Sequence, residues 1–195
     1  MIRLAFHVDS HIVSKFTPLV EKGIVLPADT GCSLKAFLCG QLGLSEEYLD
    51  QRIQTLFLDF RPVDDVDEAV VKDGAIVALS AAMPGLLGAT MRKGGRYAAF
   101  RKDISVQEDT ASKIEKKKGR VTIKLFNMVA KEVGGHLLQK GVEIEGGNLS
   151  RFLQNNHDAL VSGIRKVIVD GQETTINQRL MDRLAIDRVW FTLFV

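Results

Sequence analysis

The chain has 195 residues, enough for one medium-sized domain or two small ones, and its 46% hydrophobic and 26% charged residues are typical of a soluble globular protein. No apolar run approaches the ~20 residues that cross a bilayer, so we expect no membrane contact. The net charge is only +2, but residues 81–120 carry 10 Lys and Arg against 4 Asp and Glu, whereas residues 1–80 carry 7 against 12. The middle of the chain is therefore a distinct basic segment.

The first residues and the cysteines predict a cytoplasmic protein. The start of the chain alternates apolar and polar side chains and lacks the charged and apolar regions of a signal peptide. Cys32 and Cys39 lie seven positions apart in a predicted helical stretch, which puts them about two turns apart and too far for a disulfide. Unpaired thiols are typical of a reducing compartment.

The first part of the chain predicts strands around one main helix. Residues 2–8 place apolar side chains at every second position, which is the period of a half-buried strand. A helix is predicted at 33–43, where apolar residues recur at helical spacing after a capping Ser33 or Thr30. Further strands are predicted at 20–26, 53–58 and 75–83, which gives the order β-β-α-β-β.

The same order of elements returns after residue 120. The two copies are separated by about 111–119 residues, and the drift in spacing is that of a duplication altered by small insertions and deletions. The alternative is a chance likeness between two strand-rich segments. The matching pairs are 2–8 with 121–126, 22–24 with 140–142, 32–44 with 148–160, 53–61 with 164–172, and 73–79 with 187–195.

Two phrases of the first copy resemble a known family. The strand and turn at 58–63, and the phrase VKDGAIV at 71–77, are similar to the last third of the small sulfur-carrier proteins of thiamine and molybdopterin synthesis. Those proteins have the β-grasp, or ubiquitin-like, fold. The resemblance implies an α+β chain of two tandem β-grasp-like repeats, 1–82 and 120–195, each with a mixed sheet and one main helix. Residues 83–119, here called the connector, join the repeats and can add a strand.

The family's chemistry uses a free C-terminal diglycine, whose carboxylate is adenylated and then becomes a thiocarboxylate. Gly94 and Gly95 follow a basic run in this chain, but about a hundred residues lie beyond them, and the second repeat ends at Val195 without a glycine tail. A sulfur-carrier function would therefore require processing after Gly95. The alternative interpretation is that the two glycines form a flexible turn.

No pattern of metal-ligating or nucleophilic residues stands out. His7 and His11 begin in an alternating strand, where their spacing does not suit a shared metal ion, and the other histidines are isolated in sequence. The acidic run at 64–68 lacks the ligand spacing of a calcium loop. We therefore expect no catalytic residue, no metal and no cofactor, and favour a protein that is not an enzyme.

The connector holds the best candidate binding site. Five positive charges lie within eleven residues, with Tyr97 among them and no acidic residue between them, at Arg92, Lys93, Arg96, Arg101 and Lys102. Cationic side chains with interleaved aromatics are typical of surfaces that bind phosphates and stack on bases. Two alternatives stay open: the segment pairs with the acidic first repeat, or residues 96–100 form a further strand of a sheet.

The sequence as a whole favours a non-enzymatic binding or adaptor protein with modules like the sulfur carriers. A protein partner, or a second copy of the chain, would pair through an exposed sheet edge. The alternatives are a carrier processed after Gly95 and a binder of anions, nucleic acid or small molecules that uses the connector, with nucleic acid the less favoured ligand.

Overall fold

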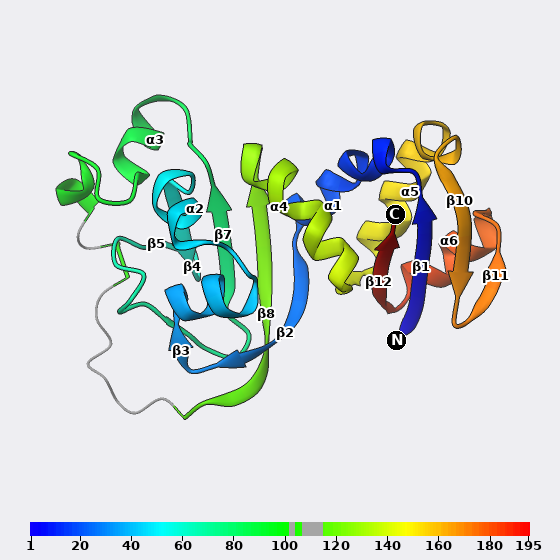
Figure 1. Ribbon diagram of the computed structural model, residues 1–195, viewed down its shortest axis with the longest axis horizontal. Coiled ribbons are helices and arrows are strands. Elements are labelled where there is room, and N and C mark those ends of the chain that lie inside the picture. The colour runs from blue at the N-terminus through cyan, green and yellow to red at the C-terminus, as the bar shows by residue number, and fades with distance from the viewer. Residues whose placement is uncertain (102–103, 107–114) are drawn as a thin grey trace. The chain divides into compact units, whose positions relative to one another are not determined.

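The computed structural model describes the chain except for residues 102–103 and 107–114. It combines mixed sheets with helices, so the fold class is α+β, as predicted (Figure 1). In the described residues, no helix is both long enough and apolar enough to span a bilayer.

The chain forms two compact units. Unit 1 consists of residues 1–25 and 130–195, and unit 2 consists of residues 26–129. These units do not follow the order of the chain, because the first strand lies in the same sheet as the strands of the C-terminal third. They therefore differ from the predicted division into 1–82, 83–119 and 120–195.

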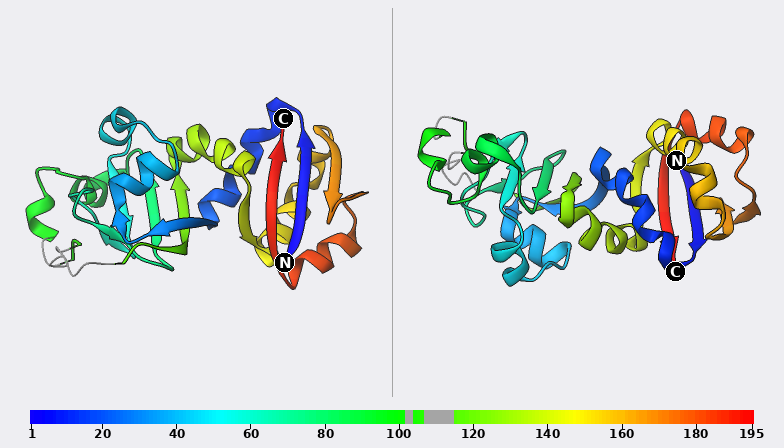
Figure 2. Two further views of the ribbon diagram at one scale, coloured as in Figure 1. Left: turned by 60° about the horizontal axis from the view of Figure 1, so that its bottom comes forward. Right: turned by 90° about the horizontal axis from the view of Figure 1, so that it is seen from above.

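The sheet of unit 1 is built from β1 (Ile2–Val8), β9 (Val142–Glu145), β10 (Ile164–Val169), β11 (Gln172–Thr174) and β12 (Arg188–Phe194). Its strand order is β11-β10-β1-β12-β9. The central strands β1 and β12 are parallel and lie side by side in both views of Figure 2, and β10 and β9 pair antiparallel with them on the two outer sides.

The core of unit 1 is aromatic. The strand predicted at 2–8 is present, and alternate residues along it are buried, as the period-2 pattern requires. Phe6 meets Phe16 and Phe191 edge-on, with ring centroids 6.1 and 5.4 Å apart. The helical segments are η1 (Ser10–Phe16), α1 (Thr17–Lys22), α4 (Asn127–Lys140), α5 (Gly146–Val161) and α6 (Gln178–Ala185).

The main sheet of unit 2 has the order β2-β8-β7-β4-β5. Its strands are β2 (Ile24–Thr30), β4 (Thr55–Leu58), β5 (Arg61–Pro62), β7 (Ile76–Ser80) and β8 (Lys117–Phe126). A second, small sheet pairs β3 (Cys32–Ser33) with β6 (Val70–Val71). The helical segments are η2 (Ala36–Gln41), which is of the π type, α2 (Glu46–Gln51), α3 (Gly85–Met91) and η3 (Ala98–Arg101).

The two main sheets have the same arrangement of strands. Each has a central parallel pair, β8 with β7 in unit 2 and β12 with β1 in unit 1. Each continues on one side into an antiparallel hairpin, β4-β5 or β10-β11, and has its outer strand, β2 or β9, on the other. Equivalent strands come in a different order along the chain in the two units. β1, the first strand of the chain, has the place in unit 1 that β7 has in unit 2.

The turns of the two hairpins, β4-β5 and β10-β11, make equivalent hydrogen bonds. Asp59 and Asp170 both have positive φ, 48° and 50°. The Asp59 carboxylate accepts the N–H of Ile76 at 2.8 Å, and the Asp59 N–H donates to the Ile76 carbonyl at 2.9 Å; Asp170 makes the same two bonds with Arg3 at 2.9 and 2.8 Å. Arg3 in β1 therefore corresponds to Ile76 in β7, and the predicted correspondence of 2–8 with 121–126 does not hold.

Several segments differ from the sequence prediction in type or position. The strand predicted at 20–26 lies at Ile24–Thr30, because Thr17–Lys22 form α1 with Pro18 in the first turn, where a proline is well tolerated. The stretch before β9, for which no helix was predicted, is the helix α4 (Asn127–Lys140).

Candidate functional site

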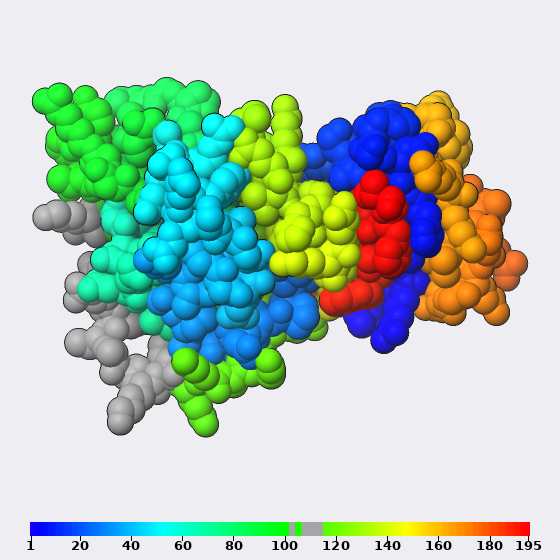
Figure 3. Space-filling model, in the orientation of Figure 1, coloured from blue at the N-terminus to red at the C-terminus, as the bar shows by residue number. Residues whose placement is uncertain are grey.

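The connector forms one wall of a pocket on unit 2. After β7 the chain makes α3, a turn at 92–95 and η3, and Figure 3 shows this part of the connector, in green, on the surface. Between it and the start of β4 lies a pocket of about 460 Å³, here called the connector pocket. The lining residues are Gln54, Thr55, Ala82, Met83, Gly85, Gly88, Ala89, Arg92, Gly94, Gly95, Arg96 and Tyr97.

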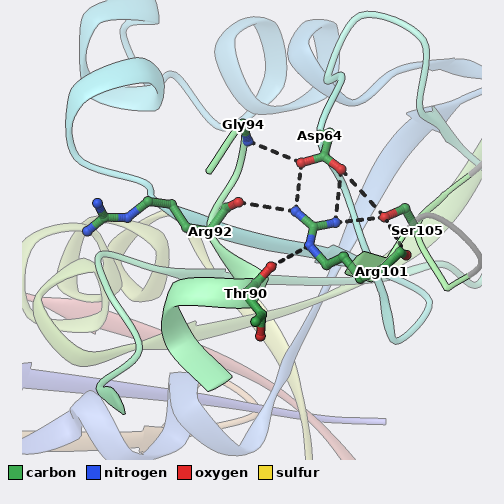
Figure 4. Close-up of polar contacts among 6 residues, drawn as sticks. All are labelled: Asp64, Thr90, Arg92, Gly94, Arg101 and Ser105. Carbon is green, nitrogen blue, oxygen red and sulfur yellow. Dashed lines mark hydrogen bonds and ion pairs between the residues drawn. The ribbon is translucent and has the colours of Figure 1, made fainter. Parts of the chain in front are cut away.

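Arg101 is a structural residue that holds the connector on unit 2 (Figure 4). It is 4% exposed, and its guanidinium binds both carboxylate oxygens of Asp64, at 2.6 and 2.9 Å. The other hydrogen bonds of the guanidinium go to the carbonyls of Thr90 and Arg92, at 2.6 and 3.1 Å, and to the hydroxyl of Ser105, at 2.7 Å. All five N–H groups are thus used inside the unit, and none is left for a ligand.

Lys93 is a second anchor. Its ammonium group donates to the Leu49 carbonyl at 3.2 Å and lies 3.5 Å from the Asp50 carboxylate, both on α2, and its side chain is 16% exposed. Its backbone N–H donates to the carbonyl of Gln54 at 2.7 Å. Two of the predicted site cations are therefore paired with acidic residues of the first eighty, which was one of the alternatives left open by the sequence.

Arg92 and Arg96 are the cations that face the pocket. Both are exposed, and the Arg92 guanidinium donates to the side-chain carbonyl of Gln54 at 2.5 Å. Within the described residues, neither has a carboxylate partner, and no Asp or Glu is among the residues that line the pocket. As far as the structure describes it, the wall of the connector pocket therefore carries positive charge without a compensating carboxylate.

Gly94 and Gly95 lie in an ordered turn. The Gly95 N–H donates to the Arg92 carbonyl at 3.1 Å, Gly94 has a φ of +60°, and its N–H donates to the Asp64 carboxylate at 3.1 Å (Figure 4). A left-handed φ suits glycine because it has no Cβ. Gly94 and Gly95 therefore form a turn, and both line the connector pocket.

Thr55 carries a buried hydroxyl without a partner. The residue is 1% exposed, lies at the start of β4 and lines the pocket, and its Oγ1 is the one buried side-chain polar atom of the described residues with no hydrogen bond. Its cross-strand neighbour Ser80 donates its hydroxyl to the Ala82 carbonyl at 3.2 Å and accepts the amide of Asn127 at 3.0 Å. The polar groups around the floor of the pocket are thus satisfied except at Thr55.

The remaining predicted site residues are distributed as follows. Tyr97 lines the pocket and is 39% exposed, and its ring stacks on that of Phe100 at 6.2 Å. Lys102 lies outside the described residues. The alternative of a strand at 96–100 is wrong, because Ala98–Arg101 form the helical turn η3. The structure adds Gln54 and Thr55, which carry no signal in the sequence, since their role depends on the fold of the connector over β4.

The remaining candidate groups are the histidine, cysteine and carboxylate side chains. Among the residues that the structure describes, no three His, Cys, Asp or Glu side chains are grouped so as to hold a metal ion. Burial raises the pKa of the Cys32 and Cys39 thiols, which keeps both in the weakly nucleophilic protonated form near neutral pH. This environment favours a packing role for Cys32 and Cys39 over a nucleophilic one.

Comparisons of the chain with protein-family models, with curated proteins and with solved structures found no match.

Proposed function

We propose that the protein is a non-enzymatic binding protein whose connector pocket takes a small anionic molecule. The observation that carries the proposal is the division of the connector cations into two classes. Lys93 and Arg101 are bound to carboxylates and carbonyls, whereas Arg92 and Arg96 stand on the pocket wall with no carboxylate partner among the described residues. A positively charged pocket with no acidic lining attracts an anion.

The anchored residues make this site preorganised. Arg101 and Lys93 fix the turn at 92–95 from both sides, and so they fix the backbone from which Arg92 and Arg96 project. A ligand then needs to order only the side chains that bind it, because the backbone that carries them is already held. Guanidinium groups suit this task, because their planar donors match the oxygens of phosphate and carboxylate groups.

The shape of the site favours a small ligand over a nucleic acid chain. Nucleic-acid surfaces extend cationic side chains along a groove to follow the backbone. Of the four predicted cations that the structure describes, two are used internally, and the other two lie at one pocket of about 460 Å³, within the range typical of small-molecule sites.

We propose further that both units are β-grasp-like. The support is the strand order shared by the two sheets, with a parallel central pair, a hairpin beside it, and a main helical segment, η2 or α5, between the outer strand and the hairpin. In this interpretation the units have the fold of the sulfur carriers with the strands connected in a different order, and function is argued from the pocket alone.

The binding proposal is tested by calorimetric titration of the protein with inorganic phosphate, glycerol 3-phosphate and malate at low and moderate salt. At least one should bind, more weakly at higher salt. Replacing Arg92 and Arg96 together by glutamine should weaken that binding about 10- to 100-fold, because each loses charge-assisted hydrogen bonds. Arg61, exposed on β5 of the same unit and outside the pocket, is the matched control. Equal binding by the double variant, or no binding of any of the three, would refute the proposal.

A further inference from the structure

The unpartnered hydroxyl of Thr55 calls for a ligand group of its own. A buried polar atom without a hydrogen bond is costly, and nearly all such atoms in folded proteins have a partner. Thr55 is 1% exposed and lies in the wall of the connector pocket, beside the exposed Arg92 and Arg96. The pocket thus combines two cations with a buried neutral hydroxyl that has no partner, which is more than an anion alone requires.

The size of the pocket points the same way. A volume of about 460 Å³ is that of a site for an organic molecule, and an inorganic ion held by the two arginines would leave most of it empty. Met83 and Tyr97, whose side chains are largely apolar, also belong to the wall. The site therefore offers contacts to both an anionic group and an organic body.

The geometry points to a small organic phosphate as the ligand, with its phosphate on Arg92 and Arg96 and an uncharged hydroxyl or carbonyl group on Thr55. This inference rests on the proposed function of the pocket. A phosphate monoester carries close to two negative charges near pH 7, which matches the two arginines that have no carboxylate partner in the described part of the chain. Thr55 then selects for what the phosphate is attached to.

The inference requires a movement of side chains, because the Thr55 hydroxyl oxygen is covered in the structure. A threonine has three staggered positions about χ1, and in the proposed complex the one that turns the hydroxyl toward the ligand is occupied. Arg92 is free to move with the ligand, because its guanidinium is held by the single neutral amide of Gln54. The floor of the site, by contrast, is fixed by the pairing of β4 with β7.

The test separates binding from stability with two matched substitutions. Thr55→Val removes a hydroxyl that has no partner, whereas Thr30→Val removes one that donates to the Lys117 carbonyl at 3.1 Å; both threonines are 1% exposed and lie in unit 2. Glycerol 3-phosphate, ribose 5-phosphate, inorganic phosphate and malate are titrated into each variant and into the unmodified protein. Urea unfolding of the same samples gives their stability.

We expect ribose 5-phosphate or glycerol 3-phosphate to bind at least 10-fold more tightly than inorganic phosphate or malate. Thr55→Val should weaken the binding of that ester on the order of 5-fold, with inorganic phosphate unaffected and the protein no less stable. Thr55→Ser should retain the affinity. Thr30→Val should lower stability and leave the affinity unchanged.

Three results would overturn the inference. If the phosphate ester binds Thr55→Val as tightly as it binds the unmodified protein, Thr55 does not contact the ligand. If inorganic phosphate or malate binds the unmodified protein as tightly as the ester does, the ligand is not an organic phosphate. In both cases the arginine double variant still tests anion binding, and the proposed function stands if that variant loses it. No binding of any of the four compounds would overturn the inference together with the proposed function.

Discussion

Replacing Arg101 by methionine should release the connector from unit 2. The substitution keeps an unbranched apolar stem but removes every hydrogen bond of the guanidinium. The Thr90 and Arg92 carbonyls lose these bonds, and the Asp64 carboxylate loses its ion pair but keeps the N–H of Gly94. Breaking a buried ion pair by removing one partner costs about 3–5 kcal/mol. Because the Asp64 side chain is 38% exposed and can be hydrated, we expect a smaller loss, about 2 kcal/mol, in the free energy of unfolding.

The same substitution should change local opening more than global stability. Trypsin cleaves after Lys and Arg, and the turn at 92–95 is protected only while the connector is held down. We expect Arg101→Met to be cut there at least 10-fold faster than the unmodified protein. Arg183→Met, which removes an exposed pair with Asp170, should cost less than about 1 kcal/mol and leave the connector protected. Unchanged cleavage and unchanged urea unfolding of Arg101→Met would show that the clamp does not hold the connector.

Two further predictions concern the framework. The backbone N–H of Arg3, and after it the Arg183 side chain, hold the pKa of Asp170 below its usual value. The contribution of Asp170 to stability is therefore present above about pH 4 and is lost as the pH falls through the lowered pKa. Asp170→Asn should flatten this loss of stability in acid, measured by urea unfolding from pH 6 to 2. Residues 24–129 should fold as a separate fragment with a dispersed NMR spectrum, whereas 130–195 should need residues 1–25, which supply β1; a folded 130–195 fragment by itself would contradict this assignment.

The sequence predicts strands better than it predicts their neighbours. The alternation of apolar residues identifies residues 2–8 as a strand, and the likeness of 53–61 to 164–172 identifies two segments that do take equivalent places, in β4-β5 and β10-β11. The same alternation is compatible with any partner strand, because it reports only which face is buried. Whether β1 corresponds to β7 or to β8 is decided by long-range bonds such as those between Asp170 and Arg3, which leave no trace in the local pattern.

The helix α4 shows how a local signal is overridden. Two adjacent glycines, Gly134 and Gly135, lower the intrinsic helix propensity of the segment and favour an irregular stretch. In the structure they lie within the helix, where a Cβ would come within 3.0 Å of Val20 and 2.8 Å of Val13. Their small size therefore permits close packing inside unit 1, and this gain is invisible to propensity.

The candidate site was predictable in its charge and not in its chemistry. The run of cations marks the connector, but the sequence cannot tell Arg101, whose donors are all used internally, from Arg96, which is exposed. That difference arises from the position of Asp64, which is 37 residues away along the chain. Thr55 is likewise an ordinary strand residue until the connector folds over it and leaves its hydroxyl without a partner.

The connector and its pocket follow from the strand order of unit 2. Because β7 and β8 are parallel neighbours, the chain that leaves Ser80 must return along the length of the sheet before it enters Lys117. Parallel strands need a crossover of a dozen or more residues, and a crossover of that length must be fastened to the unit to keep its shape. Arg101 and Lys93 do this. The pocket lies where the crossover leaves the sheet beside β4. Arg92 and Arg96, which do not hold the crossover in place, are the cations available there to a ligand.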